Sequence, residues 1–166
     1  MFKNLETHYQ PGSRVGHMLK LKPSEKDLDL VITGAEYGTG KRRGWLSSFI
    51  LSCRGKNNSE FLEIGKVGTG VKELKESKEG ITFDKLNDLL RPLIISEKGK
   101  SVSIKPKIIV AVTYQEIQHS PNYSSGWALR FPRITALRED KPLSETADLK
   151  EVEKDFKNQK RNWQYG

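Results

Sequence analysis

The chain has 166 residues, of which 35% are hydrophobic and 30% charged, and its formal net charge is +8. This length suits one domain with a core, and the positive charge favours polyanionic partners such as nucleic acid or nucleotide phosphates. No run of about 18 apolar residues occurs, so no membrane span is expected. The N-terminus shows no apolar signal segment, and the single cysteine, Cys53, excludes an internal disulfide. We therefore expect a cytoplasmic protein.

The first half of the chain is dominated by segments that predict β-strands. An alternation of leucine and lysine over 19–22 predicts a short strand with both lysines on one face. Longer strands are predicted over 28–37, 46–54 and 60–67, where apolar and β-branched residues are bounded by glycine-rich or polar turns. These segments indicate a sheet built from consecutive strands.

One internal helix is predicted over residues 82–90. Thr82 is a suitable N-cap, and Pro92 is expected to end the helix. The apolar side chains of the segment share one face: Phe83, Leu86, Leu89 and Leu90. The helix therefore has one side that can pack against a sheet.

The second half of the chain returns to extended segments and ends in a helix. Strands are predicted over 102–105, 108–117 and 128–137, and Pro132 favours an edge or a bulge in the last of them. A terminal helix is predicted over 149–156, with Leu149, Val152 and Phe156 on one face.

This order of elements predicts a mainly β protein. Three strands, a helix and two further extended segments are typical of an OB-fold barrel of about five strands, here with one internal helix and a C-terminal helix. A generic small barrel or an SH3-like sheet fits the pattern nearly as well.

Three basic clusters are candidates for phosphate binding, and the first is the pair Lys20 and Lys22. Period two places both ammonium groups on one strand face, where they could hold one phosphate. A surface strand with its lysines in water is the alternative, and these residues alone favour it.

The second cluster is the loop 38–44, which contains Lys41, Arg42 and Arg43. A phosphate-binding P-loop is excluded, because Ala35 takes the place of its first glycine and Arg42 the place of its Ser or Thr. We interpret the loop as a basic hairpin that touches a nucleic-acid backbone. An ordinary hairpin loop is the alternative.

The third cluster places four cations within 12 residues: Arg130, Arg133, Arg138 and Lys141. Phe131 lies among them, and the planar arginine fork suits phosphate oxygens. The alternative is a salt-bridged exit from the barrel, in which Glu139 and Asp140 neutralise their neighbours.

No independent catalytic or metal site is predicted. The three histidines lack metal-ligand spacing, and Cys53 lies in an apolar strand. Four aromatic residues are expected to pack rather than to stack on bases: Tyr37, Trp45, Phe49 and Phe61.

Several segments, in this order, resemble known motifs. HMLKLKP is similar to motif V of nucleotidyltransferases, and RFPRITALREDK is similar to motif VI. DLVITGAEYGTGKRRGW, GKVGTG and YSSGWALRFPR lie at the expected spacing, and MFKN resembles the end of motif IV. Together they resemble the C-terminal part of ATP-dependent DNA ligases, particularly archaeal ones, which are similar to eukaryotic replicative ligases. The resemblance runs to about residue 156.

This resemblance implies an activity and roles for the basic residues. Such ligases seal nicks in duplex DNA through enzyme-AMP and DNA-adenylate, with ATP and Mg²⁺, in DNA replication, repair and recombination. It implies ATP-phosphate contacts for seven cations: Lys3, Lys20, Lys22, Arg130, Arg133, Arg138 and Lys141. It implies DNA contacts for Lys41, Arg42, Arg43 and Lys66.

The sequence departs from the family pattern at several positions. Neither the K-x-D-G motif with its nucleophilic lysine nor the glutamate of motif IV occurs. Met18 stands where motif V usually has tryptophan, and Ala136 stands where motif VI often has arginine. We therefore expect a piece of a ligase that is inactive alone.

The expected organisation follows from the motifs. Residues 1–26 are expected to be the end of a nucleotidyltransferase (adenylation) domain, and residues 27–166 an OB-fold DNA-binding domain. Expected partners are nicked duplex DNA and the missing adenylation and DNA-binding domains, with the protein as a monomer. The main alternative is a stand-alone OB module that binds single-stranded nucleic acid. An RNA ligase or capping enzyme fits the RFPR and KVGTG segments less well.

Overall fold

Strand β3 (Lys26–Tyr37) is the common element of the main sheet. The computed structural model describes residues 2–3, 18–19, 26–57, 59–68, 70–71 and 81–163, without the side chains of 2–3, 18–19 and 160–163. Leu28, Leu30 and Ile32 of β3 are buried on one face of the strand, which lines the core, and Val31 on the other face is buried as well. The strand predicted over 28–37 is confirmed and begins two residues earlier.

Strands β4 (Leu46–Arg54) and β5 (Phe61–Val67) follow β3 as an antiparallel meander. On its other side, the first half of β3 pairs with β8 (Ile109–Tyr114), which pairs with β11 (Arg133–Leu137). The strand order is therefore β11-β8-β3-β4-β5. Both predicted meander strands are confirmed.

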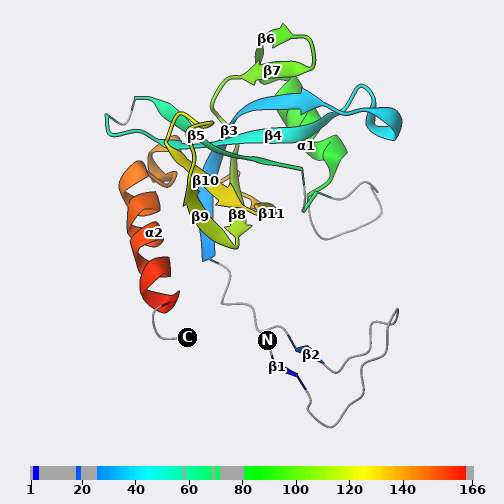
Figure 1. The fold of residues 1–166 in the computed structure, drawn as a ribbon. Coiled ribbons are helices and arrows are strands. Elements are labelled where there is room, and N and C mark those ends of the chain that lie inside the picture. Colours follow the sequence, from blue (N-terminus) through cyan, green and yellow to red (C-terminus); the bar gives the residue numbers. More distant parts are fainter. Residues whose placement is uncertain are drawn as a thin grey trace.

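A second pair of strands, β9 (Glu116–His119) and β10 (Trp127–Arg130), forms a separate two-stranded sheet that lies between the two edges of the main sheet. Strand β9 continues β8, and β10 leads into β11. Between the two pairs, the amide of Gln115 donates to the carbonyl of Arg130 at 2.9 Å, so the hydrogen bonding carries on across the break. Next to β10, the amide of Glu63 in β5 donates to Ser124 Oγ at 2.8 Å. The result is an OB-fold barrel, in which the bent pairs β8–β9 and β10–β11 act as single strands (Figure 1).

Helix α1 (Phe83–Leu90) lies between the third and fourth barrel strands, as predicted. Thr82 is its N-cap, because Thr82 Oγ1 accepts a hydrogen bond from the amide of Lys85 at 3.3 Å. Asn87, buried on α1, satisfies both backbone groups of Leu46: its Oδ1 accepts from the amide at 2.8 Å and its Nδ2 donates to the carbonyl at 3.1 Å. This side chain ties α1 to the start of β4.

A hairpin that the sequence only half predicted extends the sheet. It consists of β6 (Ile94–Lys98) and β7 (Ser101–Ile104), and β7 pairs with the second half of β3 (Figure 1). The predicted strand over 102–105 corresponds to β7. Strand β6 was missed because its residues face mostly solvent and show no apolar alternation.

Helix α2 (Leu149–Trp163) packs across β9 and is longer than the predicted 149–156. Leu149 and Val152 are buried, and the ring of Phe156 lies 4.5 Å from that of Trp127, centre to centre. The side chain of Gln159 bonds both backbone groups of Ile117, with its Oε1 accepting from the amide at 2.8 Å. No helix among the described residues is long and apolar enough to cross a membrane.

Candidate functional site

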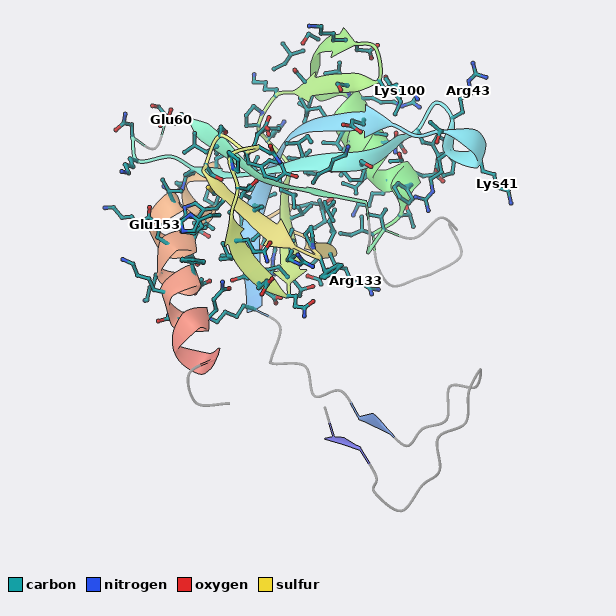
Figure 2. The ribbon with its side chains drawn as sticks, viewed as in Figure 1. Lys41, Arg43, Glu60, Lys100, Arg133 and Glu153 are labelled. Atoms are coloured by element: carbon teal, nitrogen blue, oxygen red, sulfur yellow. The ribbon has the colours of Figure 1, made fainter. Side chains whose placement is uncertain are left out.

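The loop between β3 and β4 presents two of its three cations to solvent. It contains a short 3-10 turn (Gly40–Arg42), and the backbone is closed by the amide of Gly38, which donates to the carbonyl of Trp45 at 2.9 Å. Lys41 and Arg43 are exposed and project from the tip (Figure 2). Within the described ranges no carboxylate forms an ion pair with either side chain.

The third cation of this loop, Arg42, faces the protein. Its guanidinium carbon lies 4.8 Å from the ring centre of Phe83, the first residue of α1. Phe83 is fully buried and also lies 6.3 Å from Trp45, ring centre to ring centre. Arg42 therefore anchors the loop on α1, and we assign the outward contacts of the loop to Lys41 and Arg43.

Lys66, the fourth residue for which DNA contact is expected, lies on β5. Its ammonium group forms an ion pair with Glu36 of β3, and both side chains are partly exposed. A phosphate at this point would meet a cation already paired with a carboxylate. The pair therefore carries no net charge, unlike Lys41 and Arg43.

Two motif VI cations converge on one carboxylate. Arg138 Nε lies 3.2 Å from Asp29 Oδ1, and Lys141 Nζ lies 2.5 Å from Asp29 Oδ2. The hydrogen bond and charge of Asp29 raise the pKa of Lys141. Asp29 is 16% exposed, whereas Arg138 and Lys141 are 40% and 31% exposed, so the cations keep an open side.

The other two motif VI cations lie at the opposite end of β11. Arg130 Nε lies 3.6 Å from Glu116 Oε1, and its guanidinium carbon lies 5.2 Å from the ring centre of Phe131. Arg133 is exposed. Arg133 and Arg138 lie five residues apart along the chain, roughly 16 Å for an extended strand. The four cations therefore form two pairs rather than one cluster.

Phe131 combines high exposure with an unusual backbone. Its side chain is 68% exposed, and its φ of 50° is the one positive φ outside glycine among the described residues. Such a conformation is costly for a residue with a large side chain, and it concentrates at functional sites. The break between β10 and β11 falls at Phe131 and Pro132, where the sequence predicted an edge or a bulge.

The GKVGTG segment lies against motif VI. A Cβ added to Gly70 would lie 2.0 Å from the carbonyl oxygen of Ile134, and Gly70 has φ +92°. Only glycine fits this approach and this backbone conformation. The GKVGTG segment and motif VI, which the sequence analysis connected only through a family resemblance, are therefore neighbours in the fold. The turn after β5 packs against the strand that carries Arg133.

Three expected phosphate contacts lie outside what the structure describes. Lys20 and Lys22 fall outside the described residues, and of Lys3 only the backbone is given, paired in β1 (Phe2–Lys3) with β2 (Met18–Leu19). Within the described part of the chain, no three His, Cys, Asp or Glu side chains are grouped to hold a metal ion.

Sequence reasoning missed the partners of the cations. Asp29 was read only as part of a strand, although it alternates with the buried Leu28 and Leu30 and so had to face away from the core. That alternation was a usable signal for an outward carboxylate. Its pairing with Arg138 required the order of the strands as well.

Comparison with known proteins decides the family. A family model described as the ATP dependent DNA ligase C terminal region matches residues 42–141. The chain belongs to the ATP-dependent DNA ligase family. The match begins inside the basic loop, at Arg42, and includes all of motif VI, so the predicted resemblance is confirmed.

Individual ligases are similar over almost the whole chain. A DNA ligase of Nanoarchaeum equitans is 52% identical over 160 residues, which are 96% of this chain and 28% of that protein. One of Thermococcus onnurineus is 45% identical over 161 residues, 97% of this chain and 27% of that protein. This ligase region thus spans about a quarter of the length of these curated relatives.

Solved structures show the same fold. The ligase domain from M. tuberculosis LigD superposes with a TM-score of 0.57 at 25% identity, over 87% of this chain and 45% of that one. A mycobacterial DNA ligase D complexed with ATP and MES gives a TM-score of 0.53 at 25% identity, over 87% and 44%. The OB-fold prediction is confirmed.

Proposed function

We propose that this ligase region acts as the OB domain of an enzyme that seals nicks in duplex DNA through enzyme-AMP and DNA-adenylate. Residues 1–26 would then end the adenylation domain, and residues 27–166 would form the OB domain. The family match supports the assignment, and the two separate basic surfaces of the barrel suit a domain with two tasks.

The first task is to meet the phosphates of ATP. Arg138 and Lys141 supply donors that suit phosphate oxygens, and both have an open side. We assign them to the pyrophosphate leaving group, together with Arg130 and Arg133 at the opposite end of β11. We assign Lys3, Lys20 and Lys22 to the nucleotide side. Mg²⁺, when bound in the complete enzyme, would neutralise phosphate charge.

The second task is to hold DNA. Lys41 and Arg43 project from a loop fixed on α1 and form no ion pair with the described carboxylates, so they can meet backbone phosphates without losing a partner. Asp29 and Tyr37 lie eight residues apart on β3, up to roughly 26 Å along an extended strand. The two tasks would therefore use different parts of the barrel.

The same proposal predicts what these 166 residues do not do alone. They contain no K-x-D-G motif, so no lysine of this type is present to attack the α-phosphate of ATP. We expect no self-adenylylation and no nick sealing unless an adenylation domain is supplied. Incubation with labelled ATP tests this, and a covalently labelled chain would contradict it.

The alternative of a stand-alone single-strand binder fits the aromatic residues less well. Single-strand binding needs exposed rings on which bases stack. Phe49 is fully buried, and Tyr37, Trp45 and Phe61 are half-buried in the packing of the barrel. These four rings offer no stacking platform, and the exposed Phe131 is a single ring rather than a row on which successive bases stack.

A titration separates the two functions. The chain is added to a labelled nicked duplex and to a single strand of equal length at two salt concentrations. Tighter binding to the nicked duplex that weakens with salt supports the ligase assignment, because log affinity falls by about 0.9 per neutralised phosphate and per unit of log salt. Preference for the single strand would favour the alternative.

A further inference from the structure

The tip of the β6–β7 hairpin lies beside the basic loop. Residues Ser101–Ser103 of β7 pair with Gly34–Glu36 of β3, and the amide of Tyr37 donates to the carbonyl of Lys100 at 2.9 Å. Tyr37 is the last residue of β3, and the basic loop begins at the next position. The hairpin tip and the loop are therefore neighbours at one end of the barrel.

The hairpin tip is a tight, open turn that carries two lysines. Lys98 pairs with Ser101, so Gly99 and Lys100 form the turn, with Gly99 at φ +64° and no atom within 4 Å of an added Cβ. Lys98 and Lys100 are exposed. In the described part of the chain no carboxylate forms an ion pair with either lysine.

The acid next to these lysines is held against β3. Glu97 Oε1 accepts a hydrogen bond from the hydroxyl of Tyr37 at 2.8 Å, and this bond raises the pKa of Tyr37. The carboxylate thereby fixes the hairpin to the end of β3. The ammonium groups of Lys98 and Lys100 are left for an external partner.

A further cation borders the same surface. Arg91, exposed at the end of α1, donates from Nη2 to the carbonyl of Gly44 at 3.1 Å and so lies at the far side of the basic loop. Lys41, Arg43 and Lys100 extend from the same end of the molecule, away from Glu153 of α2 (Figure 2).

We infer that Lys98 and Lys100 bind the phosphate backbone of duplex DNA together with Lys41 and Arg43, as one surface built from two neighbouring loops. The inference rests on the proposed function of this chain. Duplex DNA carries a charge about every 3.4 Å along each strand, so two adjacent basic loops can meet phosphates of the same strand. Lysines act as point charges, so this surface adds affinity without sequence preference.

Charge-removing variants test the inference on the chain itself. Lys98→Gln with Lys100→Gln is compared with Lys41→Gln with Arg43→Gln, and with a control of equal charge on exposed positions of α2, Lys154→Gln with Lys157→Gln. Affinity for a labelled nicked duplex is measured over a range of salt. The hairpin variant should bind about tenfold more weakly at 0.1 M salt. The slope of log affinity against log salt (the salt slope) should become shallower by about 1.8, because two cations are removed.

Lysine acetylation read by mass spectrometry gives a direct contact readout. DNA should protect Lys41, Lys98 and Lys100 from acetylation and leave Lys154 and Lys157 reactive. If the hairpin variant matches the α2 control while the loop variant binds weakly, the inference is wrong and the proposed function stands. If the unaltered chain binds no duplex, or binds it independently of salt, both are wrong.

Discussion

The carboxylate of Asp29 accepts a hydrogen bond from Nε of Arg138 at 3.2 Å, although the two residues lie 109 positions apart in sequence. The other carboxylate oxygen binds Lys141 at 2.5 Å, so one acid on β3 holds both cations at the end of motif VI. A fixed acid holds both side chains against β3 before any phosphate arrives. It also lowers the net positive charge that a phosphate would meet.

Asp29→Asn keeps the size and shape of the side chain but removes its charge, so the folded state should be less stable. Asp29 binds two cations, and the loss of its charge weakens both interactions, so Tm should fall by a few degrees. Glu139→Gln is the matched control, because Glu139 pairs with Lys85 at 3.2 Å while both side chains are more than half exposed. That control should change stability little. Equal Tm values for the two variants would show that the bonds of Asp29 to Arg138 and Lys141 do not stabilise the fold.

Gly70→Ala should be far more damaging than an alanine at another positive-φ glycine. At Gly70 the new Cβ would lie 2.0 Å from the carbonyl oxygen of Ile134, whereas at Gly126, with φ +78°, it would meet nothing within 4 Å. Backbone strain alone costs about 1–2 kcal/mol, so Gly126→Ala should lose about that much. Gly70→Ala should lose at least 2 kcal/mol more, on the order of a severe packing defect. Urea denaturation of both variants measures the difference, and similar losses would contradict the close approach.

Substitutions of the three cations in the basic loop should differ in their effects on stability and on duplex binding. Arg42→Ala should lower stability by about 1 kcal/mol, because the guanidinium lies over Phe83. Lys41→Ala and Arg43→Ala, at exposed positions, should stay within about 0.5 kcal/mol of the unaltered chain. Each of these two should reduce the salt slope of duplex binding by about 0.9. A stability loss in Lys41→Ala, or none in Arg42→Ala, would reverse the assignment.

The sequence predicted the barrel because its core obeys simple periodicity. Alternation in β3 and the spacing of Phe83, Leu86 and Leu90 reflect real burial, so these elements were found almost to the residue. Strand β6 has four exposed residues out of five, including Ile95, and therefore carries no apolar alternation. Strand β6 forms because it pairs with β7, and the local pattern of apolar residues does not predict this pairing.

The candidate site was predicted less completely than the fold. Spacing located cations such as Arg42 and Arg138, because charge is visible in a sequence. Their environments differ for reasons of tertiary structure: α1 brings Phe83 under Arg42, and the order β11-β8-β3 brings Asp29 to Arg138. A single sequence does not give the order of strands in a sheet. It therefore could not distinguish a cation that packs against the protein from one that faces solvent.

The buried thiol of Cys53 should report on folding and on alkaline pH. Burial raises its pKa from 9.0 to about 11. The native thiol should therefore resist a thiol reagent at pH 8, and the urea-unfolded chain should react. Because the folded state holds this proton more tightly, stability should fall as pH rises from about 9 to 11. Cys53→Ala should remove that part of the pH dependence; an unchanged dependence would show that other groups cause it.

Phe131 should contribute to DNA affinity without contributing charge. Its ring is 68% exposed and its backbone has φ +50°, so the fold gains little from the side chain and tolerates strain to present it. Phe131→Ala should leave stability within about 0.5 kcal/mol, since an exposed ring is lost.

The same variant should weaken binding to a nicked duplex severalfold, because an exposed ring that can touch the nucleic acid is lost. Because no cation is removed, the salt slope should remain that of the unaltered chain, unlike the slope of Lys41→Ala. Arg130 packs on this ring at 5.2 Å, so a changed slope would mean that Phe131 acts by positioning Arg130 rather than by touching DNA. Unchanged affinity would leave the strained backbone at Phe131 without a role in binding.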